Sequence, residues 1–214
     1  YRKVWAYKIR VFQLQKRVEG VEIAVGAFFN GNEFVYPINV NFEHKRLFPG
    51  NIGPMTGEMG TAMFWSESNR IFEATLRKIE EKLKEEKYAG YIDINCIVNS
   101  QGIYPLEFTA RFGYPTIQIQ SEGISMPMGE FLFSLADGSL KKFKTKSGFQ
   151  VGLRIVVPPF PFKDNKTFEA NSKDMVILFE KPIREGIHIE DVKMKNDEWV
   201  ITGTSGVVLI VVGT

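Results

Sequence analysis

The sequence predicts an α+β fold in two parts, an antiparallel sheet with one long helix over residues 1–125 and a small β-rich domain over residues 126–214. An Asn-Gly pair between two apolar runs predicts a β-hairpin in the first part. Apolar residues at helical spacing, with charged residues between them, predict the helix. Short apolar runs separated by Gly, Asn and Asp turns predict the strands of the second part.

The composition limits the class of protein. Of the 214 residues, 44% are apolar and 24% are charged, which supports a folded core and excludes intrinsic disorder. The 27 Lys and Arg against 25 Asp and Glu leave a net charge of +2, which indicates no nucleic-acid or anionic-membrane partner. The most apolar run, residues 207–212, is far shorter than the roughly 20 residues that span a bilayer. The single cysteine, Cys96, permits no internal disulfide and favours a cytoplasmic protein.

The first elements are a hairpin and a glycine-rich segment. Residues 21–29 and 34–42 are apolar runs on either side of Asn30-Gly31, so they predict two paired strands. Residues 51–60 contain three glycines and one proline without periodicity, which predicts a loop able to bring backbone N–H groups close to a ligand.

A long helix is predicted next. Either Ser66 or Ser68 can cap it, and its apolar positions recur at helical spacing. These positions are Phe72, Leu76, Ile79 and Leu83. The Lys and Glu residues between 78 and 87 then form a solvated face.

Residues 91–98 and 103–110 predict a second hairpin. A three-residue loop, Ser100-Gln101-Gly102, with Gly102 in the left-handed conformation, places Asn95 opposite Glu107 and Asp93 opposite Thr109. Because strand side chains alternate, these four polar residues share one face and Cys96 points to the other. Past residue 126, a helix is predicted over 128–136 and strands over 149–157, 175–179, 198–202 and 207–212.

Two groups of residues have the chemistry of a site. Glu107, Thr109 and Arg111 on one strand face suit Mg²⁺ and the phosphates that it bridges, and the alternative is a cross-strand salt-bridge ladder. Residues 43–46, a run of four ionisable side chains beside the glycine-rich segment, suit an anionic substrate, and the alternative is a charged strand end. His188 has no partner for metal binding in the sequence, and Cys96 is expected to be a buried, inert thiol.

Five segments in order resemble the phosphoribosylamine-glycine ligase family. They are EGVEIAV at 19–25, EHKR at 43–46, GPMTGEMG at 53–60, LEFTARFGYP at 106–115 and VGLRIVVPPFP at 151–161. The family motifs that match the middle three are DHKR, GPNTGGMG and EFNCRFGDPE. The resemblance implies the C-terminal half of an ATP-grasp unit, followed by the family's small β-rich C-terminal domain.

The resemblance also implies a reaction. The family uses ATP to activate a carboxylate as an acyl phosphate, an amine then attacks it, and ADP and phosphate are released. ATP and Mg²⁺ are therefore the expected cofactors, and a small amine and a small carboxylate the expected partners.

The roles that the resemblance implies fall on the following residues. The ATP-binding residues are Gln15, Lys16, Val18 and Glu22; the metal ligands are Glu107, Thr109, Asn95 and Asp93; the catalytic residues are Arg111, Lys45 and Arg46; and the substrate-binding residues are Glu43, His44, Gly53, Pro54, Thr56, Gly57, Met59, Gly60 and Tyr114.

Several positions depart from the family pattern. Gln15-Lys16 replaces two acids, Thr109 replaces Asn, Glu58 replaces Gly and Tyr114 replaces Asp. The lysine segment of the ATP-grasp small subdomain is not found in this sequence, so a partner half, from the same gene or a separate chain, is expected, and this chain alone is expected to be inactive. The rival hypothesis is a non-catalytic ATP-grasp-like domain that binds a nucleotide or a protein.

Overall fold

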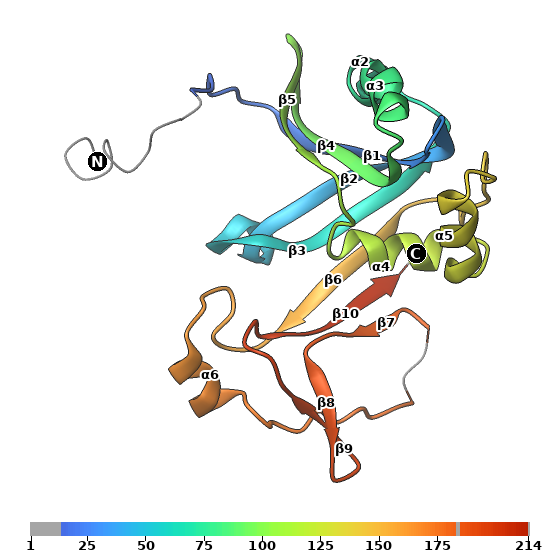
Figure 1. The fold of residues 1–214 in the computed structure, drawn as a ribbon. Coiled ribbons are helices and arrows are strands. Elements are labelled where there is room, and N and C mark those ends of the chain that lie inside the picture. The colour runs from blue at the N-terminus through green and yellow to red at the C-terminus, as the bar shows by residue number, and fades with distance from the viewer. Residues whose placement is uncertain (1–13, 183–184, 214) are drawn as a thin grey trace.

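The computed structural model describes residues 14–182 and 185–213, and its main feature is one eight-stranded sheet (Figure 1). The strand order is β5-β4-β1-β2-β3-β6-β10-β7, and each neighbouring pair is antiparallel. The strands are β1 Val21–Asn30, β2 Phe34–Phe48, β3 Ile52–Ser66, β4 Ala89–Asn99, β5 Gly102–Thr109, β6 Gln150–Val156, β7 Ile187–Ile189 and β10 Val207–Gly213. Strands β8 Val192–Lys195 and β9 Glu198–Ile201 form a separate hairpin. The predicted α+β class is confirmed.

The first predicted hairpin is confirmed. Strands β1 and β2 pair from Ala24↔Asn41 to Phe29↔Phe34. Gly31 has a φ of 91°, and the Asn30 side chain accepts hydrogen bonds from the backbone N–H groups of Asn32 and Glu33 at 3.0 and 2.9 Å. The chain therefore reverses at Asn30-Gly31, as the sequence predicted.

The loop predicted over residues 51–60 is wrong, because this segment is the first part of strand β3. A short 3₁₀ turn, Pro49–Asn51, reverses the chain, and β3 then pairs back along β2. Strand β2 extends to Phe48, well beyond its apolar part, so its backbone groups need hydrogen-bond partners that the glycine-rich segment supplies. The result is a two-stranded extension at the end of the sheet, with register shifts on either side of the Arg46↔Met55 pair.

The single long helix is also wrong. The segment forms α2 Arg70–Ala74, the 3₁₀ turn η2 Leu76–Ile79 and α3 Glu80–Glu85, with a break at Thr75. The N-cap is Asn69, whose side chain accepts hydrogen bonds from the N–H groups of Ile71 and Phe72 at 2.9 Å each. The predicted apolar face holds, since Phe72 and Leu76 are fully buried and the following two apolar positions pack on the same core.

The second hairpin has the predicted register for an unexpected reason. Asn99 pairs with Gly102, so the loop has two residues rather than three, and Gly102 does not adopt a positive φ. A register shift after Asn95↔Glu107 then adds one residue on β5 and restores the predicted opposition. Asp93 lies opposite Thr109, as expected.

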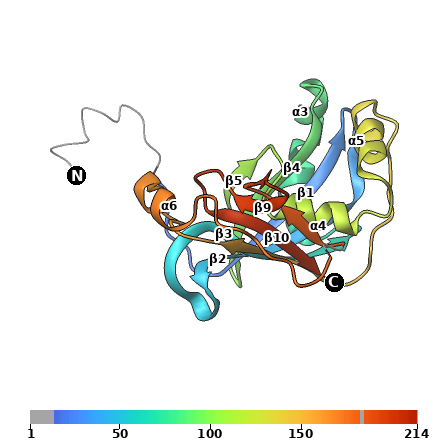
Figure 2. The same cartoon turned by 90° about the horizontal axis from the view of Figure 1, so that it is seen from below.

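The region after residue 110 continues the same sheet. Helix α4 Thr116–Gly123, which was not predicted, is followed by the predicted α5 Met128–Ala136, and α6 Asn165–Asn171 comes later. The strand predicted over 175–179 is wrong, since only Val176 makes an isolated bridge, to Val200. Strand β6 pairs with β3, and β10 pairs with β6. Figure 1 shows β6 and β10 side by side, and Figure 2 gives the perpendicular view. The single sheet therefore contains strands from both sides of residue 125. The domain boundary at residue 125 stays a prediction.

Two apolar cores cover the opposite faces of the sheet. One includes Phe29, Val40, Phe72 and Cys96, and α2 and η2 contribute to it. The other includes Phe28, Tyr91, Phe131 and Leu135, and α5 covers it. The rest of the second face carries the polar residues described next, some of them beneath α4.

None of the helices in the described part of the chain has the length and apolar character that a bilayer crossing needs.

Candidate functional site

One face of strands β5-β4-β1-β2-β3 is polar. The register places side chains of these strands on a common face because strand side chains alternate. The residues of this polar face are Glu22, Asn39, Asn41, Glu43, Lys45, Thr61, Asp93, Asn95, Glu107 and Thr109. Ala24 and Gly26 lie at its centre, and the Tyr91 side chain packs directly over Gly26, where a Cβ would lie 1.9 Å from the Tyr91 hydroxyl. Six residues predicted for ATP, metal or catalysis therefore meet here.

Lys45 and Asn95 together connect strands β1, β2 and β4 through Glu22 and Glu43. The Lys45 ammonium lies 2.5 Å from Glu22 Oε1 and 3.4 Å from Glu43 Oε2. Asn95 Nδ2 donates to both carboxylates, at 3.4 and 3.3 Å. Burial opposes the charge on Lys45, but the hydrogen bond and charge of Glu22 and the charge of Glu43 outweigh it, and the pKa of Lys45 is raised. The lysine is therefore a fixed cation on the polar face.

Asp93 is a buried acid without full pairing. Burial raises its pKa to about 7, the Thr109 hydroxyl opposes the shift, and the charge of Glu43 adds to it. Its Oδ1 atom is buried and has no hydrogen-bond partner. A cation at this atom would supply the missing partner and would keep the carboxylate ionised.

The residues fit a Mg²⁺ site that shares phosphate oxygens. Magnesium prefers oxygen ligands and is usually held by one or two carboxylates together with substrate phosphates. Asp93 and Glu107 supply two carboxylates from neighbouring strands, and Glu107 is exposed above the sheet. Within residues 14–182 and 185–213 no group of three or more His, Cys, Asp or Glu side chains could hold a metal by itself.

Asn39 and Asn41 extend the polar face beneath helix α4, and the sequence reasoning missed them. Asn39 Nδ2 donates to Asn41 Oδ1 and to the Tyr91 hydroxyl, at 3.0 Å each. Gln120 Nε2 of α4 donates to Asn39 Oδ1 at 3.2 Å. The sequence held a signal for these residues, since polar side chains alternate at 39, 41, 43 and 45, with apolar residues at 40 and 42 between the first three.

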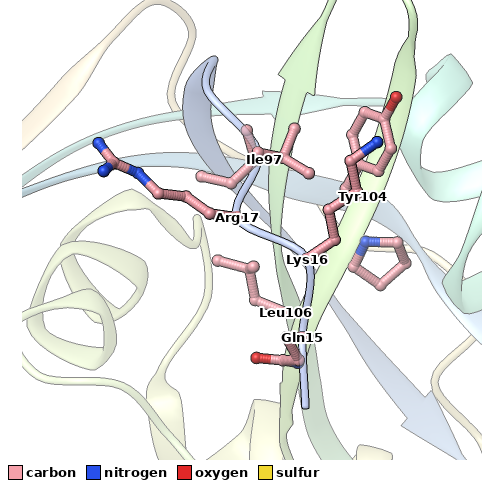
Figure 3. A pocket seen from close by; sticks show the side chains of 8 residues that line it. Gln15, Lys16, Arg17, Ile97, Tyr104 and Leu106 are labelled. Atoms are coloured by element: carbon pink, nitrogen blue, oxygen red, sulfur yellow. The ribbon is translucent and has the colours of Figure 1, made fainter.

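The predicted nucleotide hinge borders a pocket of about 530 Å³. One wall is the extended segment with Gln15, Lys16 and Val18, and the other is formed by Ile97 of β4 and by β5 (Figure 3). The β5 residues are Tyr104, Pro105 and Leu106. Glu22 is the cross-strand neighbour of Ile97, so the pocket adjoins the polar face.

The predicted substrate-binding residues do not gather at one place. Glu43 lies on the polar face, whereas His44, Met59 and Gly60 line an apolar groove of about 540 Å³ on the opposite face. His44 Nε2 lies 3.1 Å from the Phe48 carbonyl oxygen. The structure therefore does not bring His44 to the polar side chains.

The β2-β3 extension is tied together by other predicted residues. Arg46 Nη1 donates to the Gly53 carbonyl at 2.8 Å, and Thr56 Oγ1 donates to the Lys45 carbonyl at 2.9 Å. Pro54 lies between these contacts on β3. The guanidinium of Arg46, a predicted catalytic residue, thus binds the backbone of the β2-β3 extension in this structure.

A smaller pocket, of about 260 Å³, lies beside β3 at Gly57 and Glu58. Its lining residues are Gly57, Glu58, Arg111, Tyr114 and Arg154. Arg111 Nη1 donates to the Phe112 carbonyl at 2.9 Å. Arg154 was missed by the sequence reasoning, although it is the only charged residue of strand β6.

Glu58 is the most perturbed acid near the polar face. Burial raises its pKa to about 9, the charges of Glu43 and Asp93 add to the shift, and Arg154 and Lys45 oppose it. Its side chain also contacts Thr61 on the polar face. At neutral pH this carboxyl is therefore uncharged.

Comparison with known proteins identifies the family. Residues 10–117 match the family model described as phosphoribosylglycinamide synthetase, ATP-grasp (A) domain. The chain belongs to this family. The resemblance drawn from the five sequence segments is confirmed.

Several relatives share the family name. A phosphoribosylamine-glycine ligase of Listeria monocytogenes is 30% identical over 154 residues, covering 66% of this chain and 36% of the relative. One of Methanobrevibacter smithii is 24% identical and covers 94% of this chain and 47% of the relative. The chain thus spans about half or less of the length of these curated relatives.

Solved structures agree on the fold. The crystal structure of phosphoribosylamine-glycine ligase from Thermotoga maritima superposes with a TM-score of 0.64 and 24% identity, covering 93% of this chain and 49% of that one. Phosphoribosylglycinamide synthetase from Anaerococcus prevotii gives a TM-score of 0.53 at 13% identity. The chain therefore has part of the ATP-grasp fold.

Proposed function

We propose that this chain provides the metal- and carboxylate-activating half of an ATP-dependent carboxylate-amine ligase resembling phosphoribosylamine-glycine ligase. The observation that carries the proposal is the polar face, where Asp93 and Glu107 lie on neighbouring strands and share that face with the fixed cation Lys45. The pocket beside Gln15–Val18 adjoins this face and has room for a nucleotide base. The family membership supports the same function.

The reaction that we propose has two steps. A carboxylate oxygen attacks the γ-phosphorus of ATP, so an acyl phosphate forms and ADP leaves. The amine nitrogen then attacks the acyl carbon, a C–N bond forms, phosphate leaves with the C–O bond electrons, and the amine loses a proton to solvent. Mg²⁺ would neutralise phosphate charge in both steps.

The chain's own residues have distinct roles in this proposal. Asp93, Asn95, Glu107 and Thr109 supply oxygen ligands for the metal. Lys45 and Arg111 stabilise negative charge that develops on the transferred phosphoryl oxygens. Arg46 has a supporting role, because it holds the β2-β3 extension at Gly53.

The part of the relatives that this chain does not match is required in our proposal, either from the same gene or as a separate chain. We propose that this part binds the α- and β-phosphates of ATP and that the present chain alone does not catalyse the reaction. The experiment therefore uses the protein expressed from its complete gene. A small second domain from about residue 126 and a cytoplasmic location remain part of the proposal.

The test is a substitution in the metal site. Glu107→Gln in the complete protein should abolish ADP release from Mg-ATP, because the amide binds Mg²⁺ more weakly than a carboxylate. Glycine and phosphoribosylamine are the first substrates to offer, since the relatives are named for them. Glu81→Gln, an exposed acid on α3, is the matched control and should leave the rate unchanged. An unchanged rate in Glu107→Gln would overturn the metal assignment.

A second candidate function is a non-catalytic nucleotide- or protein-binding domain. The observation in its favour is Glu58, whose buried carboxyl adds a further acid next to Glu43 and Asp93. If Mg-ATP neither binds to the complete protein nor is hydrolysed with any acid and amine offered, this second function replaces the first.

A further inference from the structure

Arg154 is a cation with unused hydrogen-bonding capacity on the polar side of the sheet. Gly152 pairs with Thr61, so Gly152 and Arg154, two residues apart, lie on the face that carries Thr61 and Glu43. The neighbours of Arg154 in β6, Leu153 and Ile155, line the apolar groove of the opposite face. Arg154 also borders that groove, but its guanidinium donates to the Tyr114 carbonyl in the pocket that it shares with Arg111. A charged residue in this strand therefore points toward the site.

The guanidinium of Arg154 is only partly paired. Its Nη2 donates to the Tyr114 carbonyl at 2.7 Å, whereas its Nε is buried and has no partner. The ion pairs found among residues 14–182 and 185–213 do not include Arg154. A buried donor without an acceptor is costly, so the site gains when an anion supplies one.

The surroundings favour a small anion. Arg154 shares the 260 Å³ pocket with Arg111, so two guanidinium groups face one space. Glu58, the acid in the same pocket, is held in its neutral form by burial, and it offers an O–H donor rather than a negative charge. Glu190, on the other side of Arg154, is occupied by a hydrogen bond from Gln118 at 2.8 Å.

We propose that Arg154 is a specificity-determining residue that binds a second anionic group of the acid substrate, a carboxylate or a phosphate, while Arg111 faces the carboxylate that is activated. This inference rests on the proposed function and adds the substrate class, an acid with two anionic groups. Guanidinium forks match carboxylates and phosphates with two parallel hydrogen bonds, which the free Nε and an Nη of Arg154 can supply. An acid with a single carboxylate would leave this donor unpaired.

The first test is binding, which does not depend on turnover. Calorimetric titration of the complete protein should show that succinate binds and that acetate binds at least 10-fold more weakly. Arg154→Gln should weaken succinate binding about 10- to 100-fold and leave acetate unchanged, and Arg154→Lys should restore part of the loss. Arg70→Gln, an exposed arginine at the start of α2, is the matched control and should bind succinate normally.

The second test is kinetic. With Mg-ATP and an amine, we expect a lower KM for an acid with two anionic groups than for glycine, and Arg154→Gln should raise that KM with little change in kcat. A panel of dicarboxylic and phosphorylated acids identifies which anion is used.

The outcomes separate the two proposals. If succinate and acetate bind equally well, or if Arg154→Gln binds succinate like the unaltered protein, the inference is wrong even when the ligase is active. If succinate binding depends on Arg154 but no acid supports ADP release, the anion site stands and the proposed ligase function fails.

Discussion

The buried carboxyl of Glu58 should make the protein's free energy of unfolding depend on pH above neutrality. In the folded state its pKa is about 9, against 4.5 for a free Glu side chain. The folded protein therefore keeps a proton that the unfolded chain has lost, and the free energy of unfolding falls as pH rises from about 4.5 to about 9. One proton held in this way lowers the free energy of unfolding by about 1.4 kcal/mol for each pH unit in this range.

Between pH 7 and pH 8.5, the change in the free energy of unfolding should come mainly from Glu58. Asp93 has a folded pKa of about 7, so most of its contribution is lost below that pH. Over the 1.5 units above pH 7, Glu58 should lower the free energy of unfolding by about 2 kcal/mol. Glu58→Gln removes the titrating group and should abolish this decline.

The assay is equilibrium unfolding in urea, followed by tryptophan fluorescence at pH 7 and at pH 8.5. Glu81→Gln on the surface of α3 is the control and should keep the decline of the unaltered protein. Equal stability of the unaltered protein at both pH values would refute the buried, neutral carboxyl. A decline that persists in Glu58→Gln would assign the effect to another group.

Two further predictions concern the core and the helix start. Cys96 is fully buried, and burial raises its pKa to about 11. An aromatic disulfide reagent at pH 8 should therefore label this thiol in urea but not in the folded protein. Rapid labelling of the folded protein would contradict the burial of Cys96. Asn69→Ala should lower the free energy of unfolding by about 1 kcal/mol because two capping hydrogen bonds are lost. Ser68→Ala, at the neighbouring cap position that the sequence suggested, should cost less in the same urea titration, and equal costs would argue against the Asn69 cap.

Local signals in the sequence were sufficient for the hairpins. The Asn30-Gly31 pair fixes a turn through the backbone of those residues, and the alternation of polar and apolar side chains fixes which face each strand buries. The opposition of Asp93 and Thr109 was predicted correctly although the loop was not, because a bulge on β5 compensated for the shorter turn. A bulge of this kind has no dependable local signal.

The sequence by itself determined the family and the two hairpins, because these follow from neighbouring residues and strand alternation. The tertiary structure supplied the bulge on β5 that brings Glu107 and Thr109 to the face of Asp93 and Asn95. Only the tertiary structure decided that residues 52–60 form a strand, since that depends on the free backbone of β2. The pairing of β3 with β6 likewise joins segments about 90 residues apart and brings Arg154 beside Glu58 and Arg111. No local pattern specifies such a long-range pairing, so the candidate anion pocket became visible only in the folded chain.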